Sequence, residues 1–181
     1  KCREYIEKNL GGKAKIGILR FEALLPENSR RRTEGFLAEV TKLPGIEIVA
    51  KEDAWQPEQA IPVTLDMLTA HPDINVIWSA NEGGTIGATM AVKQKKAGTV
   101  SVFGTDASIQ LANFLLDPDN ILQAITGQQP YAIGTQSAEA LVKAIKGEPV
   151  EKYVTIHGIT LSRTEPEKIK EFINIQKGLT K

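Results

Sequence analysis

The stretch VIWSANEGGTIGA (residues 76–88) changes character in its middle. A run of apolar and β-branched residues stops, the polar Asn81 and Glu82 follow, and a helical pattern then resumes. This order predicts a buried strand that ends in a polar loop and is followed by a helix. The glycines within residues 83–87 would let that helix begin close to the sheet, because they carry no side chain.

The same unit of strand, polar loop and helix recurs on both sides of this stretch. Strands are predicted at residues 16–21, 46–50, 75–80, 99–105, 121–126 and 153–161. Helices are predicted near residues 1–10, 29–40 and 57–70, through residues 91–92 (with a stop at 97–98), and near 109–116 and 131–145, with a polar helical tail after residue 166. Near-continuous apolar strands that alternate with helices predict an α/β fold. We expect a three-layer parallel sheet of flavodoxin-like order, with helices on both faces.

The composition is that of an ordinary globular domain and excludes little else. The chain has 181 residues, enough for one sizeable core, with 41% hydrophobic and 24% charged residues. Lys plus Arg equal Asp plus Glu at 22 each, so the net charge gives no argument for nucleic acid, a membrane surface or an acidic substrate. No apolar run reaches the roughly 18 residues of a membrane-spanning helix.

The first residues, KCREYIEKNL, are already in helical rhythm and lack an initial methionine. We therefore expect a processed or truncated piece of a longer protein. The single Cys2 excludes an internal disulfide framework and a multi-cysteine zinc site.

Polar or aromatic residues follow each of the first five predicted strands or open the next helix. They are Arg32, Trp55, Asn81, Asp106 and Gln128. Because ligands of open parallel sheets bind outside the carboxyl ends of the strands, we expect these side chains at one edge. Guanidinium, carboxylate and amide groups suit the hydroxyls of a sugar, and an indole covers its C–H face. The set contains no nucleophile–base pair, so the site is predicted to hold its ligand without chemistry, and the protein is predicted not to be an enzyme.

Other interpretations of some of these residues stay open at this point. Trp55 could instead anchor its loop in the core, and Asp106 could cap the next helix, a position that favours Asp. Arg30 and Arg31 are expected to be solvated charges, and Trp78, inside a predicted strand, is expected in the core.

No cofactor or metal is predicted. His71 and His157 have no second ligand nearby in the sequence. Residues 83–87 lack the G-x-G-x-x-G order of a dinucleotide site, and the chain contains no G-K-[ST] phosphate loop.

Four segments together resemble the type I periplasmic sugar-binding proteins, most of all their ribose-binding branch. RTEGF (residues 32–36) is similar to their R-x-x-G-F motif, and LTAHPDINVIWSANEGGTIGA (68–88) to their helix, H-P-D turn, strand and N-D-x-x-A-x-G-A segment. VFGTDA (102–107) resembles V-G-F-D-G, and ITGQQPYAIG (125–134) resembles A-Q-x-P-x-x-I-G. The resemblance covers residues 11–161 but only the second half of a family member.

The resemblance implies one lobe of a two-lobed fold that closes on a monosaccharide and presents it to the membrane permease of an ABC transporter. Residues 1–128 would form the sugar-binding lobe. Residues 129–152 would cross to a missing N-terminal lobe, and residues 153–181 would supply a final strand and a polar tail. Such a protein is periplasmic or otherwise extracytoplasmic, either free or anchored as a lipoprotein.

Carried over by position, Arg32, Asn81, Asp106 and Gln128 would bond sugar hydroxyls. Trp55 would stack on the ring where the ribose branch has Phe, which puts ribose itself in doubt. Within residues 82–84 the chain departs from the family pattern, since Glu replaces Asp and a glycine interrupts the aliphatic spacing.

Two other functions compete with transport. The sugar-sensing domain of a LacI-type transcriptional repressor shares the fold and the motifs, although this segment itself would not contact nucleic acid. A flavodoxin-like enzyme is disfavoured, because the chain has neither a phosphate loop nor a paired catalytic base.

Overall fold

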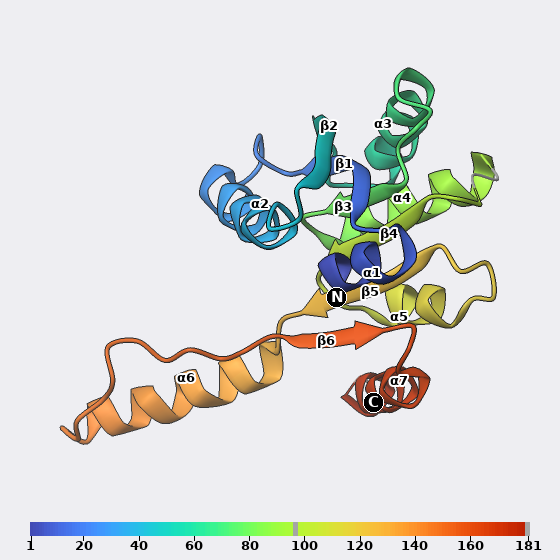
Figure 1. Cartoon of the computed structure of the whole chain (residues 1–181). Helices are drawn as coiled ribbons and strands as arrows, with labels where there is room; N and C mark the ends of the chain where they lie inside the picture. Colours follow the sequence, from blue (N-terminus) through green and yellow to red (C-terminus); the bar gives the residue numbers. More distant parts are fainter. Residues whose placement is uncertain (96–97, 180–181) are drawn as a thin grey trace.

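A six-stranded sheet with the order β2-β1-β3-β4-β5-β6 organises the chain (Figure 1). The structure is a computed structural model, and it describes residues 1–95 and 98–179. The strands are β1 (Lys13–Arg20), β2 (Gly45–Asp53), β3 (Val76–Ser79), β4 (Ser101–Thr105), β5 (Leu122–Gly127) and β6 (Ile159–Ser162). Strands β1 to β5 are parallel to their neighbours, and β6 is antiparallel to β5. The predicted flavodoxin-like order is therefore confirmed.

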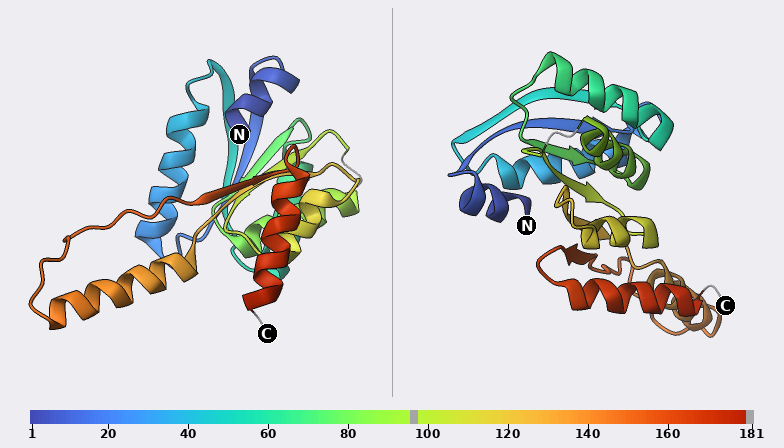
Figure 2. Two further views of the ribbon diagram at one scale, coloured as in Figure 1. Left: turned by 90° about the horizontal axis from the view of Figure 1, so that it is seen from below. Right: turned by 90° about the vertical axis from the view of Figure 1, so that its right-hand side faces the viewer.

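Helices cover both faces of this sheet, as the near-continuous apolar strands predict. They are α1 (Cys2–Asn9), α2 (Pro26–Val40), α3 (Pro57–Ala70), α4 (Glu82–Lys95), α5 (Ile109–Leu116), α6 (Pro130–Ile145) and α7 (Pro166–Leu179). One core cluster joins the sheet to α1 and α2, and the other joins it to α3, α4, α5 and α7. Figure 2 shows α3 on the opposite side of the sheet from α1 and α2. The predicted helix stop at 97–98 lies partly outside the described residues.

The core beside α2 contains the tryptophan predicted there. Trp78 is buried and stacks on Phe36 with ring centroids 4.5 Å apart. Cys2 lies in the same cluster, and burial raises the pKa of its thiol to about 12. The thiol is therefore protonated and unreactive at neutral pH.

Glycines bring α4 close to its neighbours, as the sequence predicts. A Cβ added at Gly87 would lie 2.4 Å from Cβ of Ala60 in α3. A Cβ at Gly104 of β4 would lie 2.1 Å from Oγ1 of Thr85 in α4. The helix is thus held between α3 and the sheet with no room for a methyl group at either contact.

The C-terminal part differs from its prediction in two ways. The last strand is only β6, and residues 153–158 form no helix or strand. The segment predicted as a polar helical tail is the helix α7, but it is not wholly polar, because it buries Ile169, Phe172 and Ile173 in the larger core. These three positions lie on one face of a helix, so the polar composition of the segment conceals an amphipathic pattern. Residues 180–181 of that predicted segment lie outside the described residues.

Helix α6 and the chain that returns from it form an arm that extends away from the sheet (Figure 1). We use "arm" for residues 129–158. No residue of α6 is buried. Large exposed apolar side chains on the arm are Tyr131, Ile133, Leu141, Val142, Ile145, Val150, Tyr153 and Val154.

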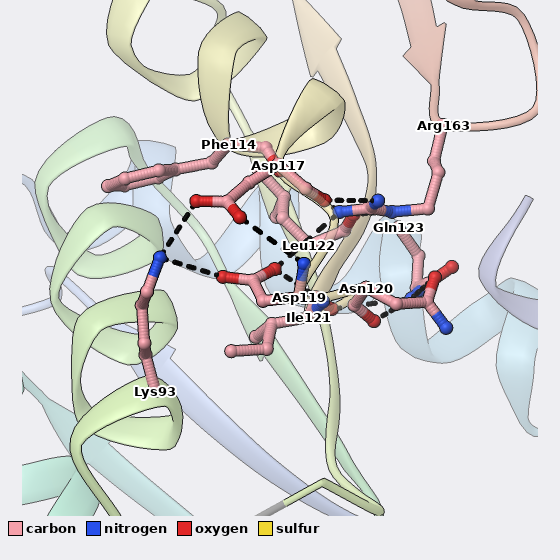
Figure 3. A network of polar contacts seen from close by, with 9 residues as sticks. All are labelled: Lys93, Phe114, Asp117, Asp119, Asn120, Ile121, Leu122, Gln123 and Arg163. Atoms are coloured by element: carbon pink, nitrogen blue, oxygen red, sulfur yellow. Dashed lines mark hydrogen bonds and ion pairs between the residues drawn. The ribbon is translucent and has the colours of Figure 1, made fainter. Parts of the chain in front are cut away.

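Arg163, directly after β6, contacts the turn between α5 and β5 (Figure 3). Its guanidinium donates to the carbonyl oxygens of Leu122 at 2.9 Å, Asp117 at 2.6 Å and Phe114 at 3.0 Å. Burial lowers the pKa of this guanidinium, although it stays charged. On the other side of the same turn, the Lys93 ammonium donates to Asp117 at 2.7 Å and lowers the pKa of that carboxyl.

Replacing Arg163 by alanine is expected to lower the free energy of unfolding by about 2–4 kcal/mol, because three carbonyls lose charge-assisted donors. Arg163→Lys is the matched control. The lysine ammonium keeps the charge, but it lacks the planar guanidinium fork that reaches three separate oxygens. About half of the loss of unfolding free energy should therefore remain. Urea unfolding followed by circular dichroism measures both. Equal stability of Arg163→Lys and the wild type would show that charge alone matters.

Candidate functional site

The five predicted site residues all lie at the carboxyl edge of the sheet. Trp55, Asn81, Asp106 and Gln128 each follow a strand by one or two residues, after β2, β3, β4 and β5. Arg32 lies in α2, the helix that follows β1. Because these strands are parallel, their ends deliver the loops to the same edge, and hydrogen bonds link the loops there.

The centre of the site is the Asp106 carboxylate. Arg32 Nη1 donates to its Oδ2 at 2.9 Å, and Gln128 Nε2 donates to its Oδ1 at 3.1 Å. The side chains of Arg32 and Asp106 are 26% and 24% exposed, so the pair is accessible from the edge. Asp106 has a φ of 72°, a left-handed conformation that Asp adopts more readily than most residues. Ser108, not Asp106, caps α5 by accepting from the backbone N–H of Leu111 at 3.3 Å.

A buried aromatic ring and a carbonyl hold Arg32 in place. Nη1 also donates to the carbonyl oxygen of Ala80 at 2.7 Å, and the guanidinium lies 5.4 Å from the centre of the Phe21 ring. Phe21 is 5% exposed. Phe21 ends the first predicted strand and is not among the five predicted site residues. Only its position at the carboxyl end of β1 could have suggested one.

The side chain of Asn81 makes hydrogen bonds to the backbone of two neighbouring segments. Its Nδ2 donates to the carbonyl oxygen of Trp55 at 2.9 Å, and its Oδ1 accepts from the backbone N–H of Gly84 at 3.3 Å. The second contact is that of a helix N-cap, so Asn81 begins α4 and also holds the preceding loop. One amide hydrogen and one lone pair remain for a ligand.

Trp55 packs against the core, as a loop anchor would, and keeps part of its surface exposed. Its side chain is half-buried and packs against the core cluster that contains Trp78 and Phe21. The remaining exposed part lies at the same edge as Asn81, whose amide contacts the Trp55 backbone.

The neighbouring arginines are solvated, as predicted. Arg30 pairs with Glu27 and Glu34, both at 2.8 Å, and Arg31 pairs with Glu27 at 2.7 Å. Hydrogen bonds from Arg30 and Arg31 lower the pKa of the Glu27 carboxyl. These exposed pairs leave Arg32 as the arginine of this run that reaches the site.

The site brings together hydrogen-bond donors and acceptors from Arg32, Asp106 and Gln128. Within residues 1–95 and 98–179, no three His, Cys, Asp or Glu side chains gather that could hold a metal ion. In the same part of the chain no helix is long and apolar enough to cross a membrane.

Comparisons with known proteins agree with this geometry. Residues 2–149 match a family model described as the periplasmic binding protein domain. The chain is 31% identical to the ABC transporter periplasmic-binding protein YphF of Escherichia coli, over 81% of this chain and 46% of that protein. It is 28% identical to the ribose import binding protein RbsB of Salmonella typhimurium, over 82% of this chain and 49% of that protein.

A solved structure shows the same fold with a sugar bound. It is an ABC transporter periplasmic solute binding protein from Actinobacillus succinogenes with bound D-allose, which matches with a TM-score of 0.82 and 28% identity. The match covers 92% of this chain and 59% of that one. The chain spans about half the length of the curated relatives it matches. It therefore belongs to the periplasmic binding protein family, in the type I sugar-binding branch, as one lobe of a two-lobed fold.

Proposed function

We propose that the chain is the C-terminal lobe of the solute-binding component of a carbohydrate ABC transporter, which binds a monosaccharide or a related polyol in a hinge cleft. The observation that carries the proposal is the Arg32–Asp106–Gln128 cluster, accessible at the carboxyl edge of the sheet. Its paired donors and acceptors match the hydroxyls of a sugar, and the half-buried Trp55 can cover a C–H face. The ligand would be released unchanged, in keeping with a family of non-catalytic proteins.

Two features favour transport over a repressor. RbsB is named as a ribose import binding protein and YphF as an ABC transporter periplasmic-binding protein, and the membrane permease of such a transporter is the partner that we propose here. Their periplasmic location supports an extracytoplasmic one here, and a lipid anchor belongs to the same proposal. A membrane fraction that takes up labelled sugar only when the full-length protein is present would test the assignment, whereas sugar-dependent release of DNA would support the repressor.

The exposed arm supports the proposed division of the chain. Residues 1–128 would form the lobe, and residues 129–152 would cross to a missing N-terminal lobe. The eight exposed apolar side chains on residues 131–154 suit a surface that is buried by another lobe. Residues 153–181 would return to the lobe, and the pairing of β6 with β5 and the burial of α7 in the larger core support this part of the division.

The chain would supply only half of the sugar site, and this explains how closure of the two lobes would signal that a sugar is bound. One lobe leaves part of the sugar in water, whereas tight sites bury roughly 70–90% of their ligand. Each charged hydrogen bond contributes only about 1.5–3 kcal/mol, even when it is shielded from water. Closure of the second lobe over the first would complete the shielding, and the closed form would dock on the permease.

The isolated 181-residue chain is therefore expected to bind sugars with a dissociation constant above about 1 mM, and the full-length protein with one near the micromolar range. Calorimetric titration of D-ribose, D-galactose, D-allose and myo-inositol against both proteins measures the difference. Micromolar binding by the isolated chain would contradict the half-site. A full-length protein that ignores every sugar tried would contradict the carbohydrate assignment itself.

A further inference from the structure

The backbone of Trp55 rests directly on the first turn of α4. A Cβ added at Gly83 would lie 2.2 Å from the Trp55 carbonyl oxygen and 3.2 Å from Cα of Gln56. The Asn81 amide donates to the same carbonyl oxygen at 2.9 Å. Two independent features thus fix the Trp55 carbonyl. It accepts a hydrogen bond from Asn81, and it lies against Gly83, which has no side chain to hold it away.

The rest of the loop is fixed at both ends. Before Trp55, the backbone N–H of Ala54 donates to the carbonyl oxygen of Arg20 at the end of β1, at 3.0 Å. After it, the carbonyl oxygen of Gln56 accepts from the first turn of α3, including Ala60 N–H at 2.9 Å. Of the three residues 54–56, Trp55 meets α4 most closely: its carbonyl oxygen lies 2.2 Å from a Cβ added at Gly83, against 3.2 Å for Cα of Gln56.

The packing of α4 on its far side favours movement of the loop if Gly83 gains a side chain. There Thr85 already packs against Gly104 of β4, where no methyl group fits. We therefore expect the loop to move rather than the helix. An added Cβ would have to push the Trp55 carbonyl by about 1 Å to reach an ordinary contact distance.

We infer that Gly83 is a positioning residue for the Trp55 indole and, through it, a determinant of which sugar the site prefers. The inference rests on the proposed function. Hexoses and pentoses differ in which hydroxyls lie on the faces of the ring, so the position of an indole against one face discriminates among them. A shift of the indole by about 1 Å changes the affinity for each sugar by a different factor, and the order of preference changes with it.

The test compares Gly83→Ala with Gly87→Ala in the full-length protein. Gly87 lies one turn further along α4, where an added Cβ would meet Cβ of Ala60 at 2.4 Å and Trp55 is not among its contacts. Both variants should melt at a lower temperature. Titration with D-ribose, D-allose, D-galactose and myo-inositol should show that Gly83→Ala weakens the preferred sugar about tenfold and alters the affinity ratios. Gly87→Ala should leave those ratios unchanged.

A double-mutant cycle decides whether the effect passes through the indole. In a Trp55→Ala background, Gly83→Ala should produce no further change in the ratios. Unchanged ratios in Gly83→Ala, or an effect that persists without the indole, would overturn the inference. If Gly83→Ala does not fold, Gly84→Ala replaces it. Its Cβ would meet Ser79 Oγ at 2.3 Å, and the Ala54 carbonyl oxygen and Asn81 Oδ1 both at 3.0 Å. It therefore shifts the same loop less but also presses on Asn81, and the Trp55→Ala background separates that effect from one carried by the indole. Absence of sugar binding by the wild type would instead refute the proposed function.

Discussion

Replacing Asp106 by alanine is expected to weaken sugar binding by the full-length protein at least about 100-fold. The loss of two charge-assisted hydrogen bonds, each contributing about 1.5–3 kcal/mol, is sufficient for that effect. The carboxylate is the group that both Arg32 and Gln128 contact, so its removal also frees those two side chains. Arg32 would keep the Ala80 carbonyl as a partner but lose its counter-charge.

Asp106→Asn is the matched control for the backbone. Asn tolerates the left-handed conformation about as well as Asp, so the fold should be unaffected, whereas alanine is strained there. The amide can still accept one hydrogen bond, and we expect a loss of about tenfold. Calorimetric titration gives the affinities, and thermal melting monitors the fold. Wild-type affinity in Asp106→Ala, with the fold intact, would remove the carboxylate from the site.

The sequence predicts the sheet and its edge because both follow from local patterns. Apolar runs that alternate with helices give parallel strands, and the residue after each run then lies at the carboxyl edge. From that rule, Asp106 and Gln128 are predicted to lie near each other at this edge. The hydrogen bond that joins them confirms their proximity, while their role in holding a ligand stays a prediction.

The partners of those residues could not be predicted in the same way. The hydrogen bond from Asn81 to the Trp55 carbonyl joins residues that are 26 positions apart in the sequence. The ion pair of Arg32 and Asp106 joins residues that are 74 positions apart. Phe21 contacts Arg32 across the gap between a strand and a helix. Such contacts depend on how loops of different length meet in space. The spacing of apolar residues within a single helix or strand carries no information about this.

The error at the C-terminus has a related cause. Residues 153–161 alternate β-branched and polar residues, which is typical of a strand, yet only β6 forms a ladder because β5 is too short to pair further. Strand propensity without a partner strand leaves the backbone unpaired. In α7 charged residues stand between the apolar ones, so the apolar face is recognised only when the residues are placed at helical spacing.

The contrast between the arm and α7 leads to the largest expected effect on stability. Deletion of residues 165–181 should leave the lobe unfolded at 25 °C. Each of Ile169, Phe172 and Ile173 buries apolar surface that contributes roughly 1.5–3 kcal/mol, and their sum approaches the roughly 5–15 kcal/mol that stabilises a whole domain. The facing core, including α5, would also become exposed to water.

Removal of the arm should have almost no effect on the fold, although it deletes more residues. Gly127 of β5 pairs with Ile159 of β6, so the two ends of the arm already lie side by side. Replacing residues 129–157 by Asn-Gly would close a hairpin there. Because α6 buries nothing, the melting temperature should stay within about 3 °C of the wild type.

Thermal melting by circular dichroism, with size-exclusion chromatography, measures both deletions side by side. The arm deletion should also make the protein more soluble, because it removes eight exposed apolar side chains. Ile169→Ala tests the same core by a single change and should cost about 2–5 kcal/mol. If the arm deletion unfolds the chain while the α7 deletion does not, the boundary of the lobe must be redrawn. The crossing segment would then belong to the core of the lobe, and its apolar side chains could no longer be assigned to a second lobe.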